Sequence, residues 1–86
     1  MRLTVIVSDK VIIKDGVAVH LSLEGATQFP TTNSDYHAIQ WYENKGSIEK
    51  ISNNELVWFT DANTLNDYVN AHATEVARLN TMLGDK

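Results

Sequence analysis

The order of apolar and polar side chains predicts six short strands followed by one helix. Over the first two thirds of the chain, apolar residues alternate with polar ones or form short runs between turn residues. A period of two residues is typical of a half-buried strand. The predicted strands are Leu3–Val7, Val11–Lys14, Val17–Leu21, His37–Tyr42, Ser47–Ile51 and Glu55–Phe59.

The Asp15-Gly16 pair predicts a tight hairpin between the second and third of these strands. A two-residue primed turn requires positive φ at both central residues, which Asp-Gly tolerates. With this turn Ile13 pairs with Ala18, and Ile12 pairs with Val19. Because neighbouring residues point to opposite faces, both faces of the hairpin carry apolar side chains.

Two further connections are predicted. Glu43-Asn44-Lys45-Gly46 supplies turn residues between two strands, and Glu24–Asp35 contains glycine, proline and asparagine without any periodicity. A loop of about a dozen residues is long for a compact domain, and such loops are either functional or cover a core. We expect Phe29 to anchor this loop to the core.

After Asp61, apolar residues recur every three or four positions and predict a helix over 62–83. Asp61 is the expected N-cap, and Gly84 is expected to end the helix. The apolar stripe consists of Leu65, Tyr68, Val69, His72, Val76, Leu79 and Leu83. We expect the helix to cover the sheet through Leu65, Val69, Val76 and Leu79, with Arg78 on the opposite, polar face.

These elements predict one domain over residues 1–86 of the α+β class. The expected architecture is a small antiparallel β-meander of four to six short strands with one long C-terminal helix packed on one face. A chain of 86 residues has too little apolar material for a second core. A sheet this small has open edges, which favour self-association or docking onto a larger protein.

Charge and composition exclude several partners. Eleven acidic residues against seven basic ones give a net charge of −4, and the basic residues are scattered. Binding to a phosphate backbone requires several cations on one face, so we expect no nucleic-acid partner. The apolar run at the N-terminus is short and is followed by Asp9 and Lys10, so it predicts a strand; we expect no membrane association.

The sequence contains no motif that carries known chemistry. It has no cysteine, and His20, His37 and His72 lack metal-ligand spacing. No serine lies in a Gly-x-Ser-x-Gly context, and no phosphate-binding glycine pattern occurs. We therefore expect no catalytic residue, cofactor or metal ligand. The alternative is a small-ligand binding module or hydrolase that uses His20, His37 or the Glu43/Glu49 pair in a cleft covered by the long loop.

Large aromatic side chains are the best candidates for a binding surface, because they supply most of the affinity in many interfaces. The alternation along the chain places Trp41 with Ile39 on a core face and Tyr42 on the other face. For Trp58 the pattern leaves core and surface equally open. We expect Tyr42 and an exposed Trp58 to contact a protein partner.

The aromatic-rich segment His37–Glu49, the strand Leu3–Val7, the Asp15-Gly16 turn and Trp58–Asp61 before the helix resemble small uncharacterised proteins encoded in the tail or tail-fibre gene region of phages and prophages. The resemblance implies a non-enzymatic accessory protein that acts through protein contacts in tail structure or assembly, either with a tail component or as a homodimer. It implies a location in the bacterial host cytoplasm or the virion. Another alternative is an inhibitor or regulator of a host protein.

Overall fold

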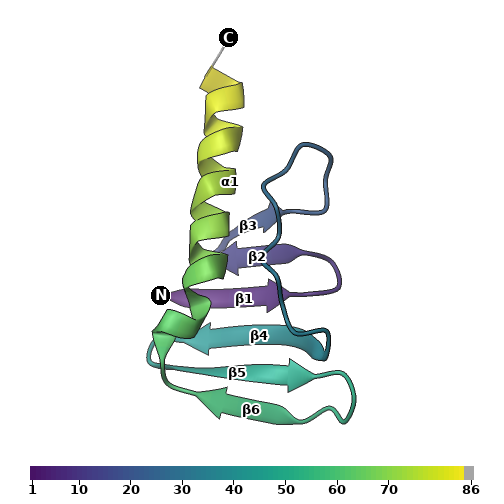
Figure 1. Ribbon diagram of the computed structural model, residues 1–86. Helices are drawn as coiled ribbons and strands as arrows, with labels where there is room; N and C mark the ends of the chain where they lie inside the picture. Colours follow the sequence, from purple (N-terminus) through teal and green to yellow (C-terminus); the bar gives the residue numbers. More distant parts are fainter. Residues whose placement is uncertain (85–86) are drawn as a thin grey trace.

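Six antiparallel strands and a C-terminal helix make up the fold over residues 1–84, the part of the chain that this computed structural model describes (Figure 1). The elements are β1 (Arg2–Ile6), β2 (Val11–Lys14), β3 (Val17–His20), β4 (Tyr36–Tyr42), β5 (Lys45–Lys50), β6 (Leu56–Phe59), the short 3-10 helix η1 (Ala62–Leu65) and α1 (Asn66–Gly84). The α+β class and the single C-terminal helical segment predicted from the sequence are confirmed.

The strands lie in the order β3-β2-β1-β4-β5-β6, and all neighbours are antiparallel. Each half of the sheet is a three-stranded meander, and the halves join where β1 pairs with β4. The connection from β3 to β4 therefore starts at one edge of the sheet and ends in its middle. Local turn signals predict each meander, but the join between them comes from pairing far apart in the sequence.

The predicted Asp15-Gly16 hairpin is confirmed. Asp15 has φ 49° and Gly16 has φ 85°, and the predicted pairs of β2 with β3 are those observed. The Asp15 carboxylate accepts a 2.9 Å hydrogen bond from the backbone N–H of Arg2. This bond, with the nearby Lys14 ammonium, holds the pKa of Asp15 below its ordinary value.

Gly46 lies within strand β5, so its predicted place in the turn is wrong. The turn consists of Glu43 and Asn44, with Glu43 at φ 55°. Gly46 pairs with Trp41 on one side and Phe59 on the other. A Cβ at this position would lie 2.5 Å from Phe59 Cζ. Glycine is thus required because the Phe59 ring occupies the space that a Cβ would fill.

The helical segment begins where the sequence predicts. The Asp61 carboxylate accepts a 3.0 Å hydrogen bond from the backbone N–H of Asn63, which satisfies one of the free donors at the N-terminus. The first turn is η1, and the α-helix α1 follows from Asn66.

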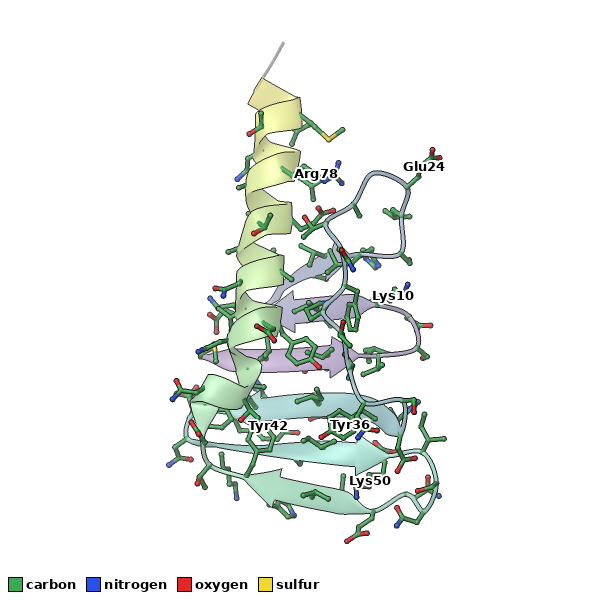
Figure 2. All side chains as sticks on the ribbon, viewed as in Figure 1. Lys10, Glu24, Tyr36, Tyr42, Lys50 and Arg78 are labelled. Carbon is green, nitrogen blue, oxygen red and sulfur yellow. The ribbon has the colours of Figure 1, made fainter. Side chains whose placement is uncertain are left out.

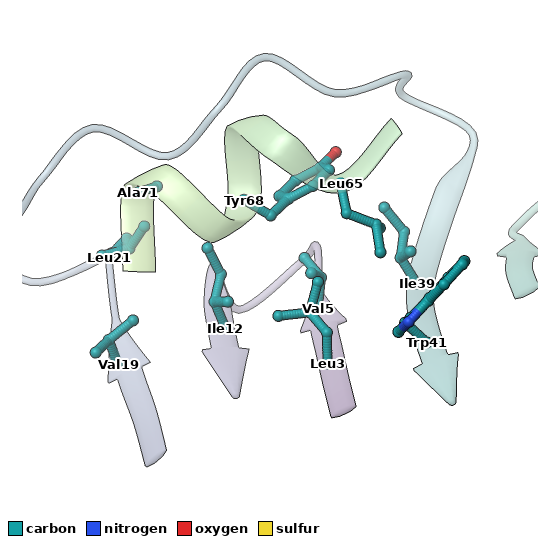
Figure 3. Close-up of a cluster of buried hydrophobic side chains, with 10 residues drawn as sticks. All are labelled: Leu3, Val5, Ile12, Val19, Leu21, Ile39, Trp41, Leu65, Tyr68 and Ala71. Carbon is teal, nitrogen blue, oxygen red and sulfur yellow. The ribbon is translucent and has the colours of Figure 1, made fainter. Parts of the chain in front are cut away.

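Ten buried side chains form a cluster between the helical segment and the sheet (Figure 3). They are Leu3, Val5, Ile12, Val19, Leu21, Ile39, Trp41, Leu65, Tyr68 and Ala71. The indole of Trp41 is 4% exposed, so its predicted core position is confirmed.

Only the first half of α1 covers the sheet. Figure 1 shows that the helix runs across the strands and extends past the edge strand β3. Leu79 is 39% exposed, so its predicted core position is wrong, whereas Val69 and Val76 pack partly buried against the cluster. Leu83, at the end of the same apolar stripe, is also exposed. The apolar stripe of the helix is therefore longer than the part of the sheet that lies beneath it.

The long loop lies on the same side of the sheet as α1 (Figure 3). The ring of Phe29 packs 6.0 Å from that of Tyr68, and the hydroxyls of Thr32 and Tyr68 share a 3.0 Å hydrogen bond. The predicted anchoring by Phe29 is confirmed. Helix and loop therefore cover one face of the sheet, and no helix or strand within residues 1–84 lies over the other face.

Candidate functional site

The uncovered face of the sheet, here called the open face, follows from strand alternation. Leu3, Val5 and Ile12 point toward α1, so their neighbours in sequence point away from it. The pairing arranges these neighbours in three rows across the strands. The first row is Arg2, Tyr42 and Lys45; the middle row is Ala18, Ile13, Thr4, Gln40, Ser47 and Trp58; the third row is His20, Val11, Ile6, Ala38, Glu49 and Leu56.

Two aromatic rings and two cations meet at one corner of the open face. The Arg2 guanidinium lies 5.5 Å from the centre of the Tyr42 ring, and the Lys45 ammonium lies 5.2 Å from the Trp58 ring. At these distances a cation is attracted by the negative face of the ring. The Tyr42 hydroxyl also donates a hydrogen bond to the Gln40 side chain. Tyr42 and Trp58, the two predicted contact residues, thus belong to the same face.

Trp58 is the most prominent side chain of this corner. It is 57% exposed although it lies within a strand, and Leu56 on the same strand is also exposed. The four residues of β6 are all large and apolar, and β6 forms the edge of the sheet. An apolar edge strand without charged side chains is unusual, because natural sheets protect their edges against pairing. The exposure of Trp58 favours a binding surface.

The charges of the open face differ from those of the whole chain. Arg2 and Lys45 occupy the first row, and among the acidic side chains of residues 1–84 only Glu49 belongs to any of the three rows. The net charge of −4 therefore arises elsewhere on the molecule. The open face carries the polar Thr4, Gln40 and Ser47 at its centre, apolar side chains on β2 and β6, cations along one margin and one carboxylate along the opposite margin.

The three histidines do not converge. His20 is exposed on the third row, and His37 is exposed at the bulge in β4. His72 is buried, and its Nε2 donates a 2.8 Å hydrogen bond to the carbonyl of Val17. Within residues 1–84 no three histidine or acidic side chains gather as metal ligands would.

The alternative carboxylate pair is also separated. Glu43 lies in the turn before β5, with one carboxylate oxygen 4.0 Å from the N-terminal nitrogen. Glu49 lies toward the other end of β5, on the third row. The long loop packs on α1, and the described part of the chain contains no pocket that it could cover.

Sequence reasoning missed the Glu75 carboxylate, which is only 1% exposed and joins the loop to α1. It accepts hydrogen bonds from the Thr27 backbone N–H (3.0 Å) and hydroxyl (2.9 Å), and from Arg78 Nε (2.7 Å). Arg78 extends from the helix toward the loop (Figure 2) rather than into solvent, which corrects its predicted polar-face position. The i, i+3 spacing of Glu75 and Arg78 is the one signal in the sequence that could have indicated this ion pair.

We expect the Glu75 network to make the fold sensitive to acid. Arg78, then the Thr27 N–H and hydroxyl, lower the pKa of Glu75 to about 2 from its ordinary 4.5. Since the folded pKa lies below the unfolded one, the carboxylate stabilises the fold above pH 4.5, and this contribution falls as the pH drops from 4.5 toward 2. In thermal melts between pH 6 and pH 3, Glu75→Gln should lose less of its melting temperature than the wild type does.

Glu24→Gln is the matched control for this measurement. Glu24 lies exposed on the same loop, and its substitution should leave the pH dependence of the wild type intact. Equal pH dependence in the wild type and Glu75→Gln would contradict a stabilising role of the ionised carboxylate.

Comparison of the chain with models of protein families, with curated proteins and with solved structures finds no match. None of the helical segments within residues 1–84 has the length and apolar character needed to cross a membrane.

Proposed function

We propose that the protein is a non-enzymatic protein-binding module and that the open face is its working surface. The observation that carries this proposal is the one-sided covering of the sheet. Helix and loop bury one face, whereas the other carries the partly exposed Ile6, Val11 and Ile13 on β1 and β2 and the exposed Trp58 on the edge strand β6. Apolar surface that is continuous across several strands and bordered by polar groups is typical of interaction sites.

The corner formed by Tyr42 and Trp58 suits a protein partner. Tyrosine, tryptophan and arginine are the side chains that most often dominate the binding energy of interfaces. Here Arg2 and Lys45 already lie against the two rings in the free chain. Binding would therefore cost less side-chain entropy than it would for mobile cations.

The sequence resemblance supports a tailed phage or prophage as the setting. We propose a role in the structure or assembly of the tail or tail fibre, in the bacterial host cytoplasm during assembly or in the finished virion. The open face would then contact a tail component or another copy of the chain.

This function predicts that Tyr42→Glu and Trp58→Ala weaken association without unfolding the chain. Removal of an aromatic side chain that dominates an interface typically costs at least about 2 kcal/mol of binding, which is about 30-fold in affinity. The measurement is sedimentation of the purified protein together with recovery of proteins by the tagged chain from a phage-infected lysate. Melting curves of each variant should match that of the wild type.

Leu83→Ala is the control, because Leu83 is a large exposed apolar residue on the overhanging end of α1, away from the open face. It should associate as the wild type does. The proposal fails if Tyr42→Glu and Trp58→Ala recover the same proteins, with the same mass in solution, as the unchanged chain.

A further inference from the structure

We propose that the open face binds a second copy of this chain, so that two sheets pack face to face around a two-fold axis that runs across the strands. This inference rests on the proposed function, because it takes the open face as a protein-binding surface. It adds the identity of the partner and the geometry of the contact. Three properties of the open face carry it: its area, its charges and the sizes of its side chains.

The area is sufficient for a weak dimer. Six strands that lie about 4.8 Å apart and are about five residues long, at about 3.3 Å per residue, present roughly 480 Å². Two copies together would bury about 1,000 Å², which is the minimum for a biological interface and lies below the roughly 1,200–2,000 Å² of stable specific ones. Paired sheets of this kind pack about 10 Å apart, with their strands within about 30° of each other.

The charges of the face complement each other under this symmetry. A two-fold axis across the strands places each strand over its own copy and reverses its direction, so the first row of one copy lies over the third row of the other. Lys45 and Glu49 lie on the same strand, β5, in the first and third rows. Lys45 therefore meets the partner's Glu49, and the reciprocal pair forms on the other side of the axis.

Side-chain sizes follow the same rule. On β4 the large Tyr42 lies in the first row and the small Ala38 in the third, so each tyrosine ring meets an alanine of the other copy. The middle row lies on the axis, where Ile13 meets the partner's Ile13. The row also contains the polar Thr4, Gln40 and Ser47, of which Gln40 already accepts a hydrogen bond from Tyr42.

The other axis that would join two sheets face to face runs along the strands, and it fits less well. It keeps the rows but reverses the order of the strands, so that β5 of one copy lies over β2 of the other. Glu49 would then face the partner's Val11, and a carboxylate buried against an apolar side chain is costly. The carboxylate of Glu49 thus favours the axis across the strands, and this axis in turn places Arg2 over the partner's Ile6.

A charge swap on β5 tests the arrangement. We expect the full chain to sediment at twice the 9.6 kDa mass of one copy at about 100 μM. Lys45→Glu and Glu49→Lys each create two like-charge contacts and should weaken the dimer at least about 10-fold. The double variant, Lys45→Glu with Glu49→Lys, restores opposite charges and should return the dissociation constant to within about threefold of the wild type.

Two controls separate this effect from general electrostatics. Lys10→Glu and Glu24→Lys make the same charge changes at exposed residues outside the three rows, and both should dimerise as the wild type does. Ile13→Glu places a carboxylate at the centre of the face and should yield a folded monomer, as judged by sedimentation and melting.

Each remaining result overturns the inference. A wild-type chain that stays monomeric at about 100 μM excludes the second copy as the occupant, and the proposed function then survives only if Tyr42→Glu and Trp58→Ala still reduce capture of another protein. A dimer that persists in Ile13→Glu uses another surface. A double variant that dissociates as readily as either single variant excludes the axis across the strands.

Discussion

Leu65→Ala should lower the free energy of unfolding by about 2–5 kcal/mol, whereas Leu79→Ala should change it by less than about 0.5 kcal/mol. Both residues belong to one apolar stripe in the sequence. Leu65 is fully buried in the cluster beside Ile39, however, and Leu79 lies on the part of α1 that extends past the edge strand (Figures 1 and 3). Truncation of Leu65 leaves a cavity, while truncation of Leu79 removes atoms that already contact solvent.

Urea denaturation of both variants, with equal dependence on denaturant, measures this difference. For a domain of this size a loss of 1 kcal/mol lowers the melting temperature by roughly 4–8 °C, so the two variants are easily distinguished. Similar losses in the two variants would mean that the overhanging half of α1 is covered in solution. Leu79→Ala is therefore also a test of where the helix leaves the core.

Gly46→Ala should destabilise the protein by about 1–3 kcal/mol, the usual cost of overpacking a well-packed site. In the interior of a strand, replacing glycine with alanine ordinarily stabilises a protein, because glycine loses more backbone entropy on folding. The destabilisation expected here is therefore opposite in sign to this backbone effect. The added Cβ would lie 2.5 Å from Phe59 Cζ and 2.7 Å from the Gln40 carbonyl oxygen. The ring cannot move freely, because it also packs 5.6 Å from the Trp41 ring.

A double-mutant cycle with Phe59→Ala measures how much of this cost comes from the ring. The loss in the double variant should be smaller than the sum of the two single losses, because without the ring the Cβ has only the Gln40 carbonyl oxygen to avoid. Unfolding free energies of the wild type and the three variants provide the test. Additive losses, or a Gly46→Ala protein as stable as the wild type, would contradict the close packing of Phe59 over Gly46.

The sequence predicts the residues of the candidate surface only where apolar and polar side chains alternate along a strand. Alternation places Tyr42 and Trp41 on opposite faces, and the structure buries Trp41. It does not determine whether Trp58 faces the core, because a four-residue run of apolar side chains offers both faces equally. The Glu75 network depends on Thr27, which is 48 residues away in sequence, and no local pattern indicates such a contact.

The sequence by itself determined the features whose causes lie within a few residues. These are the strands, the Asp15-Gly16 turn with its register, the Asp61 cap and the start of the helical segment. Each depends on backbone preferences, side-chain period or a hydrogen bond to a near neighbour. Such interactions are present in any short piece of the chain, so they can be inferred before the fold is known.

Only the tertiary structure decided the pairing of β1 with β4, the place of Gly46 beneath Phe59, the exposure of Leu79 and the burial of Glu75. A periodic pattern shows which side of an element is apolar, but it does not give the length over which another element covers that side. The sheet extends under the first half of α1 and not under the second, and one helix with one loop covers a single face of six strands. Coverage depends on how distant elements meet in space, and it left exposed the open face that we propose as the binding surface.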